Sequence, residues 1–238
     1  KKEKALQRSS KKGSKKPVIV IDPGHGGIDP GSTSGRVFEK HITLGAAKVI
    51  EKHLKKLGRY KVFLTRRNDK FIRLRKRIAI AKARGADLFI SLHADAIKNR
   101  RVRGLSVYTL SEKASDKEAA DLAKKENKAD VIAGVDLSAE SPVVSDILID
   151  LRQRNTMNES SKFAVGLVKH IRKVTKTLNN THRFAGFAVL KSPDVPSILI
   201  EMGFLSNRAD ERALRNPQYR AKLASSIGMA IDDYFSRN

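Results

Sequence analysis

The sequence predicts an α/β fold in which one twisted, mostly parallel or mixed sheet of about six strands is covered by helices on both faces. Short β-branched apolar runs alternate with stretches of helical apolar spacing, and several of the runs end directly on glycine or polar residues. With 238 residues and 40% hydrophobic content, the chain can bury one core and is predicted to form a single domain.

The first half of the chain opens with a strand, a loop and a helix. Val18 to Ile21 has the pattern of a buried strand and runs into Asp22-Pro23-Gly24, after which the chain is rich in glycine. Apolar positions then recur at helical spacing from Leu44 to Leu57, and Gly58 provides a stop. The alternation continues with predicted strands at Lys61 to Thr65, Leu88 to Leu92 and Leu105 to Leu110, and a helix over about Ile72 to Arg84.

A long segment, about residues 111–158, interrupts this alternation and has helical character. Connections in compact domains are usually about 4 to 6 residues long, so we predict a helical insertion with a role of its own. After it we expect a helix at Ser161 to Leu178, an extended segment at Phe184 to Leu190, a strand at Ser197 to Ile200 and a closing helix over about Pro217 to Phe235.

Residues 1–16 are strongly basic and nearly devoid of apolar side chains, so we interpret them as a linker or tail ahead of the domain at 17–238. The chain begins on Lys-Lys rather than on methionine, and we expect an upstream part that includes any export signal. No apolar run approaches the roughly 20 residues that span a bilayer, which predicts no transmembrane segment.

The net charge of +24 predicts an anionic partner, which could be nucleic acid, an anionic membrane or an acidic polymer such as bacterial cell wall. Nucleic acid is disfavoured because aromatic residues make up only 5% of the chain, tryptophan is absent and much of the excess charge lies in the tail. Cysteine is absent as well, so any transition metal has to be held by His, Asp or Glu.

Three predicted strands lead to residues of the kind that bind metals or carry protons. They are followed by His25, His93 and Glu201, and functional side chains in α/β sheets gather beyond the carboxyl ends of the strands. A zinc ion in a hydrolase commonly takes two histidines and a carboxylate and leaves one position open. Glu39, at the start of the helix after His25, is the candidate carboxylate.

Each of these residues also has an ordinary structural interpretation. His93 could be a satisfied buried histidine, and Glu39 could be a first-turn acid favoured by the helix dipole. His25 is flanked by glycines, which offer little packing, and Glu201 places a carboxylate on an apolar strand; both favour a functional role. The remaining histidines lack a strand-end position, and we interpret them as surface or supporting residues: His41, His53, His170 and His182.

Four motifs, in order, resemble the zinc-dependent N-acetylmuramoyl-L-alanine amidases of the amidase_3 family. They are Asp22 to Gly27 (DPGHGG), Glu39-Lys40, Ser91 to Asp95 (SLHAD) and Glu201 to Asn207 (EMGFLSN), and the likeness extends from about Pro17 to the C-terminus. The resemblance implies that His25, Glu39 and His93 bind zinc and that Glu201 is the catalytic glutamate. His41 stands where relatives often have Asp or Asn.

The resemblance also implies a reaction and a place. The reaction is hydrolysis of the amide between the lactyl group of N-acetylmuramic acid and L-alanine in peptidoglycan, for splitting the septal wall during cell division in the periplasm. Peptidoglycan would then be the anionic partner. A relative that binds cell wall without catalysis, or a nucleic-acid-binding protein, is the alternative from another class.

The insertion resembles that of Gram-negative cell-division amidases, in which a helix blocks the active site until an activator with a LytM domain displaces it. Ala119, Leu122, Ala123 and Glu126 share one face of its first predicted helix. We hypothesise that Glu126 fills the open zinc position, with Glu112 and Glu118 as the other candidates; alternatively Glu126 ends a solvated helix. A second helix, about Ser141 to Arg154, is expected to pack on the domain or to receive the activator.

Overall fold

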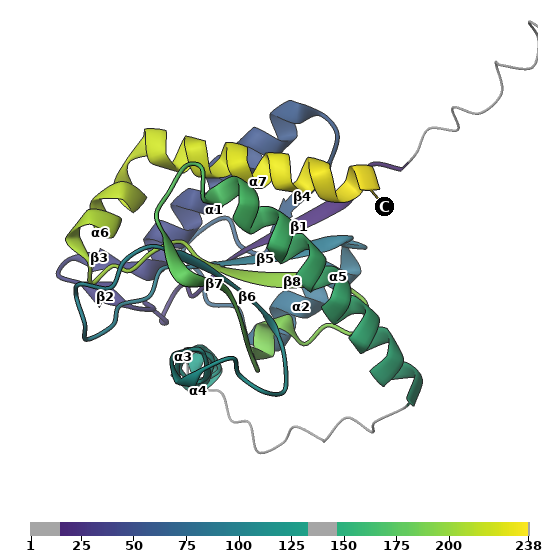
Figure 1. Ribbon diagram of the computed structural model, residues 1–238, viewed down its shortest axis with the longest axis horizontal. Coiled ribbons are helices and arrows are strands. Elements are labelled where there is room, and N and C mark those ends of the chain that lie inside the picture. The colour runs from purple at the N-terminus through teal and green to yellow at the C-terminus, as the bar shows by residue number, and fades with distance from the viewer. Residues whose placement is uncertain (1–14, 133–146, 238) are drawn as a thin grey trace, which may run out of the picture.

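The centre of the molecule is a six-stranded sheet of order β4-β1-β5-β8-β6-β7 (Figure 1). The computed structural model describes residues 15–132 and 147–237, with side chains from residue 152 onward in the second range. The strands of the sheet are β1 (Val18–Pro23), β4 (Lys61–Leu64), β5 (Leu88–His93), β6 (Leu105–Leu110), β7 (Thr177–Ala185) and β8 (Ser197–Glu201). A separate hairpin pairs β2 (Thr33–Ser34) with β3 (Val37–Phe38).

Neighbouring strands of the sheet run parallel except at one place. β6 is antiparallel to β8, while β1 is parallel to both β4 and β5, β5 is parallel to β8, and β6 is parallel to β7. This arrangement confirms the predicted mostly parallel or mixed sheet of about six strands.

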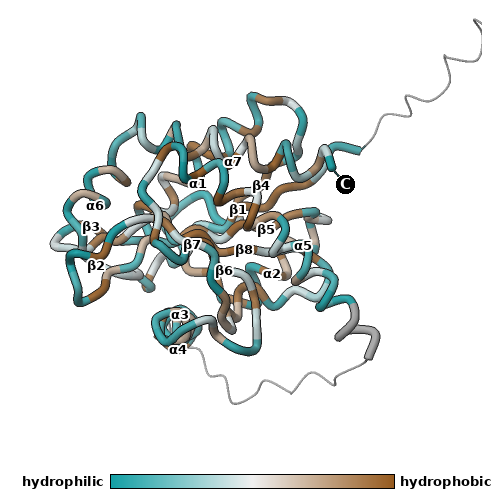
Figure 2. The backbone as a smooth tube through the Cα atoms, in the orientation of Figure 1, coloured by the Kyte–Doolittle hydropathy of each residue, from teal (hydrophilic) through white to brown (hydrophobic). Residues whose placement is uncertain are grey.

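The alternation of side chains along the strands creates two apolar cores. Ile19 and Ile21 face one side of the sheet, where α1 (Glu39–Leu57), α5 (Ile147–Ile171) and α7 (Pro217–Arg237) pack. Val18 and Val20 face the other side, where α2 (Leu74–Ala83), α3 (Lys117–Glu126) and the 3-10 turn η1 (Ala188–Leu190) lie. In Figure 1, α7 and α3 lie on opposite sides of the sheet, and Figure 2 shows the apolar strands between these layers. Helices on both faces are thereby confirmed.

Helix ends follow local sequence signals. The predicted stop at Gly58 is the left-handed C-cap of α1, with φ of 72°. Asp116 caps the N-terminus of α3 by accepting a hydrogen bond from the Ala119 amide. Asn207 does the same for α6 (Arg208–Arg215), a helix that the sequence reasoning did not predict, as it did not predict the β2–β3 hairpin.

The second half of the chain differs from the prediction at three places. In place of separate helices at Ser141–Arg154 and Ser161–Leu178, one helix, α5, runs continuously over Ile147–Ile171, because that stretch contains no proline and only one glycine. Thr177 and Leu178 open β7 instead, where pairing with β6 outweighs helical spacing. Only the start of the predicted extended segment at 184–190 is a strand, since residues 188–190 form η1.

The predicted insertion, 111–158, contains α3 and the short α4 (Ala129–Ile132) and shares α5 with the residues that follow it. Its end at 158 is therefore not an element boundary. Val143 and Val144, on which the predicted apolar face partly rests, and most of the predicted tail at 1–16 lie outside the described residues.

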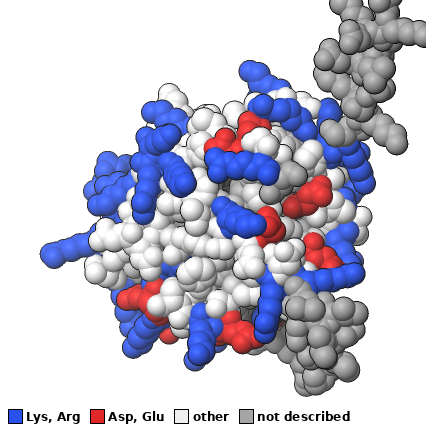
Figure 3. Space-filling view, turned by 45° about the vertical axis from the view of Figure 1, so that its right-hand side comes forward, with Lys and Arg blue, Asp and Glu red and all other residues white. Residues whose placement is uncertain are grey.

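Within 15–132 and 147–237, no helix is long and apolar enough to cross a membrane. Figure 3 shows Lys and Arg spread around one face of the molecule, with acidic side chains among them.

Candidate metal centre

Three neighbouring parallel strands bring the candidate residues to one edge of the sheet. Pro23 at the end of β1 pairs in register with Leu92 of β5, and His93 pairs with Glu201 of β8. His25 follows β1 by two residues. The carboxyl ends of β1, β5 and β8 therefore gather these side chains, as expected for an α/β sheet.

The loop after β1 fixes the orientation of His25. His25 is the one described non-glycine residue with positive φ, at 61°. Its Nδ1 lies 2.8 Å from Oδ2 of Asp29, which directs the opposite ring nitrogen, Nε2, into the site. Gly24 is required beside it, because a Cβ at that position would lie 2.5 Å from Cε1 of His93.

Two buried arginines, Arg66 and Arg77, hold the His25 loop through hydrogen bonds to its backbone. Arg77 donates to the carbonyl oxygens of Pro23 and His25, both at 2.9 Å, and to Oδ1 of Asp22 at 2.8 Å. Arg66 donates to the carbonyl oxygens of Pro23, at 3.0 Å, and Gly24, at 2.8 Å. Burial opposes ionisation of Asp22, but the adjacent Arg77 guanidinium and two hydroxyl donors lower its pKa.

Glu39 begins α1 and is fully buried. Its Oε2 accepts a hydrogen bond from the Ser32 amide, and its Oε1 accepts one from the Ala94 amide, each at 2.8 Å. The same Oε1 lies 3.1 Å from Nε2 of His25 and 3.2 Å from Nδ1 of His93. Backbone donors therefore hold this carboxylate against both imidazoles.

His25, Glu39 and His93 form the one group within 15–132 and 147–237 whose geometry could hold a metal ion. Two ligand atoms that each lie about 2.0–2.2 Å from a tetrahedral zinc ion are roughly 3.3–3.6 Å apart. The observed separations of 3.1 and 3.2 Å are close to that range. Nε2 of His25 is buried and makes no hydrogen bond despite the nearby carboxylates, as expected when the donor atoms face a common point rather than one another.

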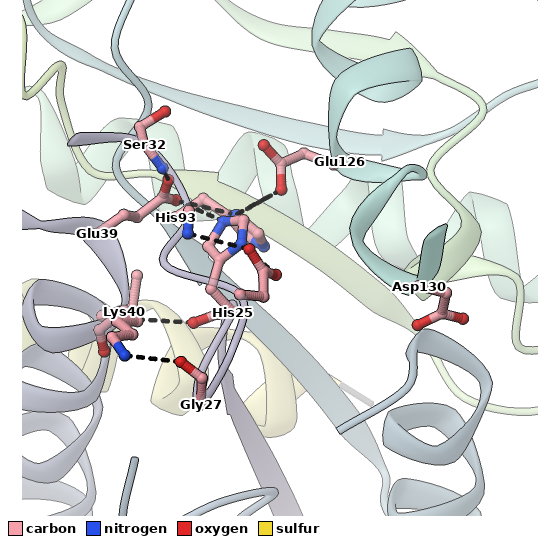
Figure 4. Close-up of polar contacts among 12 residues, drawn as sticks. His25, Gly27, Ser32, Glu39, Lys40, His93, Glu126 and Asp130 are labelled. Atoms are coloured by element: carbon pink, nitrogen blue, oxygen red, sulfur yellow. Dashed lines mark hydrogen bonds and ion pairs between the residues drawn. The ribbon is translucent and has the colours of Figure 1, made fainter. Parts of the chain in front are cut away.

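Glu126, the last residue of α3, approaches the same point from the opposite side (Figure 4). Its Oε2 lies 3.3 Å from Nε2 of His25 and 3.1 Å from Nδ1 of His93, while its Oε1 has no hydrogen-bond partner. Of the other insertion candidates, Glu112 is exposed, and Glu118 is 80% exposed and pairs with Arg183.

The side chains of His25, Glu39, His93 and Glu126 shift one another's pKa values. Burial opposes the charge on the imidazoles, but the Glu39 and Glu126 carboxylates raise the pKa of His25 well above its ordinary value, and that of His93 to about 10. Burial likewise opposes ionisation of the carboxyls, yet the imidazoles lower the pKa of Glu126 to about 2, and that of Glu39 well below its ordinary value. A metal ion bound here has to displace the imidazole protons.

Glu201 is fully buried at the end of β8. Its Oε2 accepts a hydrogen bond from the Asp95 amide at 3.0 Å, and its Oε1 has no hydrogen-bond partner. Burial raises the pKa of Glu201 well above its ordinary value; His93 opposes this shift, and the carboxylates of Glu39, Asp95 and Glu126 add to it. The protonated form of Glu201 is therefore favoured more than that of an exposed glutamate.

A second polar cluster borders this site. Ser32 Oγ donates to Oδ1 of Asp95 at 2.6 Å, and Lys125, on α3, forms an ion pair with the same oxygen. Sequence reasoning named neither Ser32 nor Lys125 and named Asp95 only as part of a motif. Of the other histidines, His41 lies beside Asp69, His170 pairs with Asp233, and His182 lies beside Thr109, all away from the site.

Residues 19–233 match the family model Amidase_3, described as N-acetylmuramoyl-L-alanine amidase. Two curated relatives are 40% identical to the chain over 228 residues each. One is N-acetylmuramoyl-L-alanine amidase AmiC of Neisseria meningitidis, where the match covers 93% of this chain and 53% of the relative. The other is AmiA of Escherichia coli K12, where it covers 95% and 78%. The chain thus spans about half the length of the first relative.

Solved structures show the same fold. N-acetylmuramoyl-L-alanine amidase AmiC2 of Nostoc punctiforme superposes with a TM-score of 0.65 at 27% identity, covering 94% of this chain and 100% of that chain. The CwlD amidase of Clostridioides difficile, at 24% identity, reaches a TM-score of 0.68 over 93% and 100%, respectively. Because the family model spans nearly the whole chain and includes every strand end that meets at the site, this chain belongs to the Amidase_3 family of N-acetylmuramoyl-L-alanine amidases.

Proposed function

We propose that the chain is a zinc-dependent peptidoglycan amidase that hydrolyses the amide between the lactyl group of N-acetylmuramic acid and L-alanine. The observation that carries this proposal is the convergence of His25, Glu39 and His93 beside the buried Glu201. The named activities of the relatives support the substrate. A wall-binding protein without catalysis would have no need for a buried carboxylate with a free oxygen at this place.

His25, Glu39 and His93 would hold the zinc. Two imidazole nitrogens and one carboxylate oxygen are a common ligand set of catalytic zinc, and the orphaned Nε2 of His25 fits it. When bound, zinc polarises the scissile carbonyl and brings the pKa of a water towards about 7. Asp29 keeps His25 in the tautomer that presents Nε2, and the Ala94 and Ser32 amides keep Glu39 in place.

Glu201 would move the proton. It takes a proton from the attacking water and delivers it to the leaving nitrogen, because its Oε1 is free and burial raises its pKa, which favours the protonated form between the two transfers. The Asp95 amide fixes the other carboxyl oxygen and so aims the free one.

Removal of metal tests the proposal. Dialysis against a chelator should abolish release of stem peptides from purified peptidoglycan, and added zinc should restore it at about one ion per chain. A His93→Ala variant should neither retain zinc nor recover activity. His41→Ala is the matched control, because His41 is 55% exposed and should leave both unchanged. Undiminished peptide release by metal-free protein would contradict the proposal.

The insertion would keep the activity of the resting enzyme low. Glu126 occupies the side of the centre opposite Glu39, where its carboxylate would complete the coordination of the metal and exclude water. We further propose that an activator with a LytM domain displaces α3, and that the enzyme acts in the periplasm on septal wall during cell division.

Glu126→Ala should raise the activity of the purified chain on peptidoglycan by roughly ten- to a hundredfold, since a charge-assisted contact contributes about 1.5–3 kcal/mol. Glu118→Ala, on the exposed side of the same helix, should not. The activator should stimulate the parent more strongly than Glu126→Ala. A Glu126→Ala variant no more active than the parent would remove Glu126 from this role.

A further inference from the structure

Lys125, one residue before Glu126, binds with its ammonium group to a polar site on the domain that is formed by Ser32 and Asp95, here called the Ser32–Asp95 site. Its Nζ donates to Ser32 Oγ at 2.5 Å and forms an ion pair with Oδ1 of Asp95. Asp95 and Ser32 are buried, with 6% of the Asp95 side chain exposed, whereas 44% of the Lys125 side chain is exposed. The Ser32–Asp95 site is therefore part of the buried domain, and the partly exposed Lys125 side chain reaches it from the solvent side.

The Ser32–Asp95 site is connected to the candidate catalytic residues by the backbone amides of its two members. The Asp95 amide donates to Oε2 of Glu201 at 3.0 Å, and the Ser32 amide donates to Oε2 of Glu39 at 2.8 Å. Figure 4 shows Ser32 beside Glu39, with Glu126 across from the two histidines. The end of α3 thus places an ammonium on Asp95, whose amide holds the proton-carrying Glu201, and a carboxylate against the metal ligands.

An ammonium and a carboxylate are also what the proposed reaction produces. Water adds across the amide, the C–N bond breaks, and the carbonyl carbon takes the oxygen. The lactyl fragment leaves as a carboxylate, and both protons of the water end on the nitrogen, which leaves as the ammonium of L-alanine. The carboxylate and the ammonium of the products form close together, and the charges of Lys125 and Glu126 likewise lie close together.

We propose that Asp95 and Ser32 form the subsite that receives the amino group of the departing peptide, and that Lys125 and Glu126 together occupy the centre as a mimic of both products. The proposal rests on the proposed amidase function. When α3 leaves, Asp95 loses its cation in a cluster that also holds Glu39 and Glu201, and a buried carboxylate without a cation is unfavourable. The amino group formed by cleavage supplies that cation.

Peptide binding to the zinc-loaded full chain tests the subsite. In a Lys125→Met/Glu126→Ala variant, which keeps an apolar stem at 125 and clears both groups, a tripeptide with a free amino-terminal L-alanine should bind at least about tenfold more tightly than its N-acetylated form. The matched control is Lys124→Met/Glu126→Ala, since Lys124 is exposed on the same helix and Lys125 still occupies the Ser32–Asp95 site. This control variant should show little preference for the free-amine tripeptide over its N-acetylated form. Isothermal titration calorimetry gives both affinities.

Asp95→Asn in the cleared variant should remove the preference for the free amine. The asparagine Oδ1 can still accept from the Ala96 amide and Ser32 Oγ, so the change removes charge and not the local fold. Ser32→Ala is the second variant, which should weaken the preference without abolishing it. Equal binding of the two peptides by the cleared variant, or an undiminished preference in Asp95→Asn, would overturn the subsite even if amide cleavage is observed. Amine preference without cleavage would instead overturn the proposed function.

Discussion

Replacement of Glu201 by glutamine should lower kcat/KM on purified peptidoglycan by about 100- to 10,000-fold, the range that a positioned proton carrier contributes. Zinc content should stay the same, because the carboxylate that completes the candidate ligand group is Glu39. Release of stem peptides and metal analysis on the same preparation measure the two quantities.

The stability of the Glu201→Gln variant should be equal to or higher than that of the parent. Glu201 is fully buried among the carboxylates of Glu39, Asp95 and Glu126, and its Oε1 has no partner, so the folded chain gains nothing from its charge. A glutamine oxygen can still accept from the Asp95 amide. Loss of activity together with equal or increased stability is typical of a residue retained for chemistry.

Glu51→Gln is the matched control. Glu51 is also a buried carboxylate, 6% exposed, but it lies on α1 away from the site, where it pairs with Lys55 and Arg67. Its variant should keep full activity. If Glu201→Gln also kept full activity, the proton would have to be carried by another group, and Asp95 would be the next residue to test.

The part of the site that sequence could predict lies at strand ends. Buried strands have a strong apolar pattern, and parallel neighbours gather at one edge, so His25, His93 and Glu201 were placed from pattern alone. Glu39 followed from its position at the start of the next helix, and Glu126 from its face on α3. The resemblance to a family assigned the roles.

The residues that sequence reasoning missed are those whose contacts depend on tertiary packing. Lys125 is 93 positions from Ser32 and 30 from Asp95, and no local pattern relates them. α5 and β7 were misplaced for a similar reason, because pairing with β6 decides where the helix gives way to a strand. Arg77 has the sequence pattern of an ordinary helix residue, although it is 2% exposed and holds the His25 loop.

Arg77→Met should destabilise the fold by about 3–5 kcal/mol, because it leaves a buried charge without its partner. Asp22 is fully buried, and the substitution removes its cation as well as the donors to the carbonyl oxygens of Pro23 and His25. Urea denaturation measures the loss. Lys76→Met, an exposed neighbour on α2, is the matched control and should stay within about 0.5 kcal/mol of the parent.

The dependence on pH identifies the cause of this loss. Because Arg77 lowers the pKa of Asp22, the pair stabilises the folded state above the unfolded carboxyl pKa of about 3.9, and this stabilisation is lost as pH falls through the lower folded value. The difference between parent and Arg77→Met should therefore shrink in acid. Asp22→Asn added to Arg77→Met should recover part of the loss at neutral pH, since no uncompensated carboxylate remains. If the double variant were as unstable as Arg77→Met, the missing donors to the His25 loop, and not the stranded charge, would account for the effect.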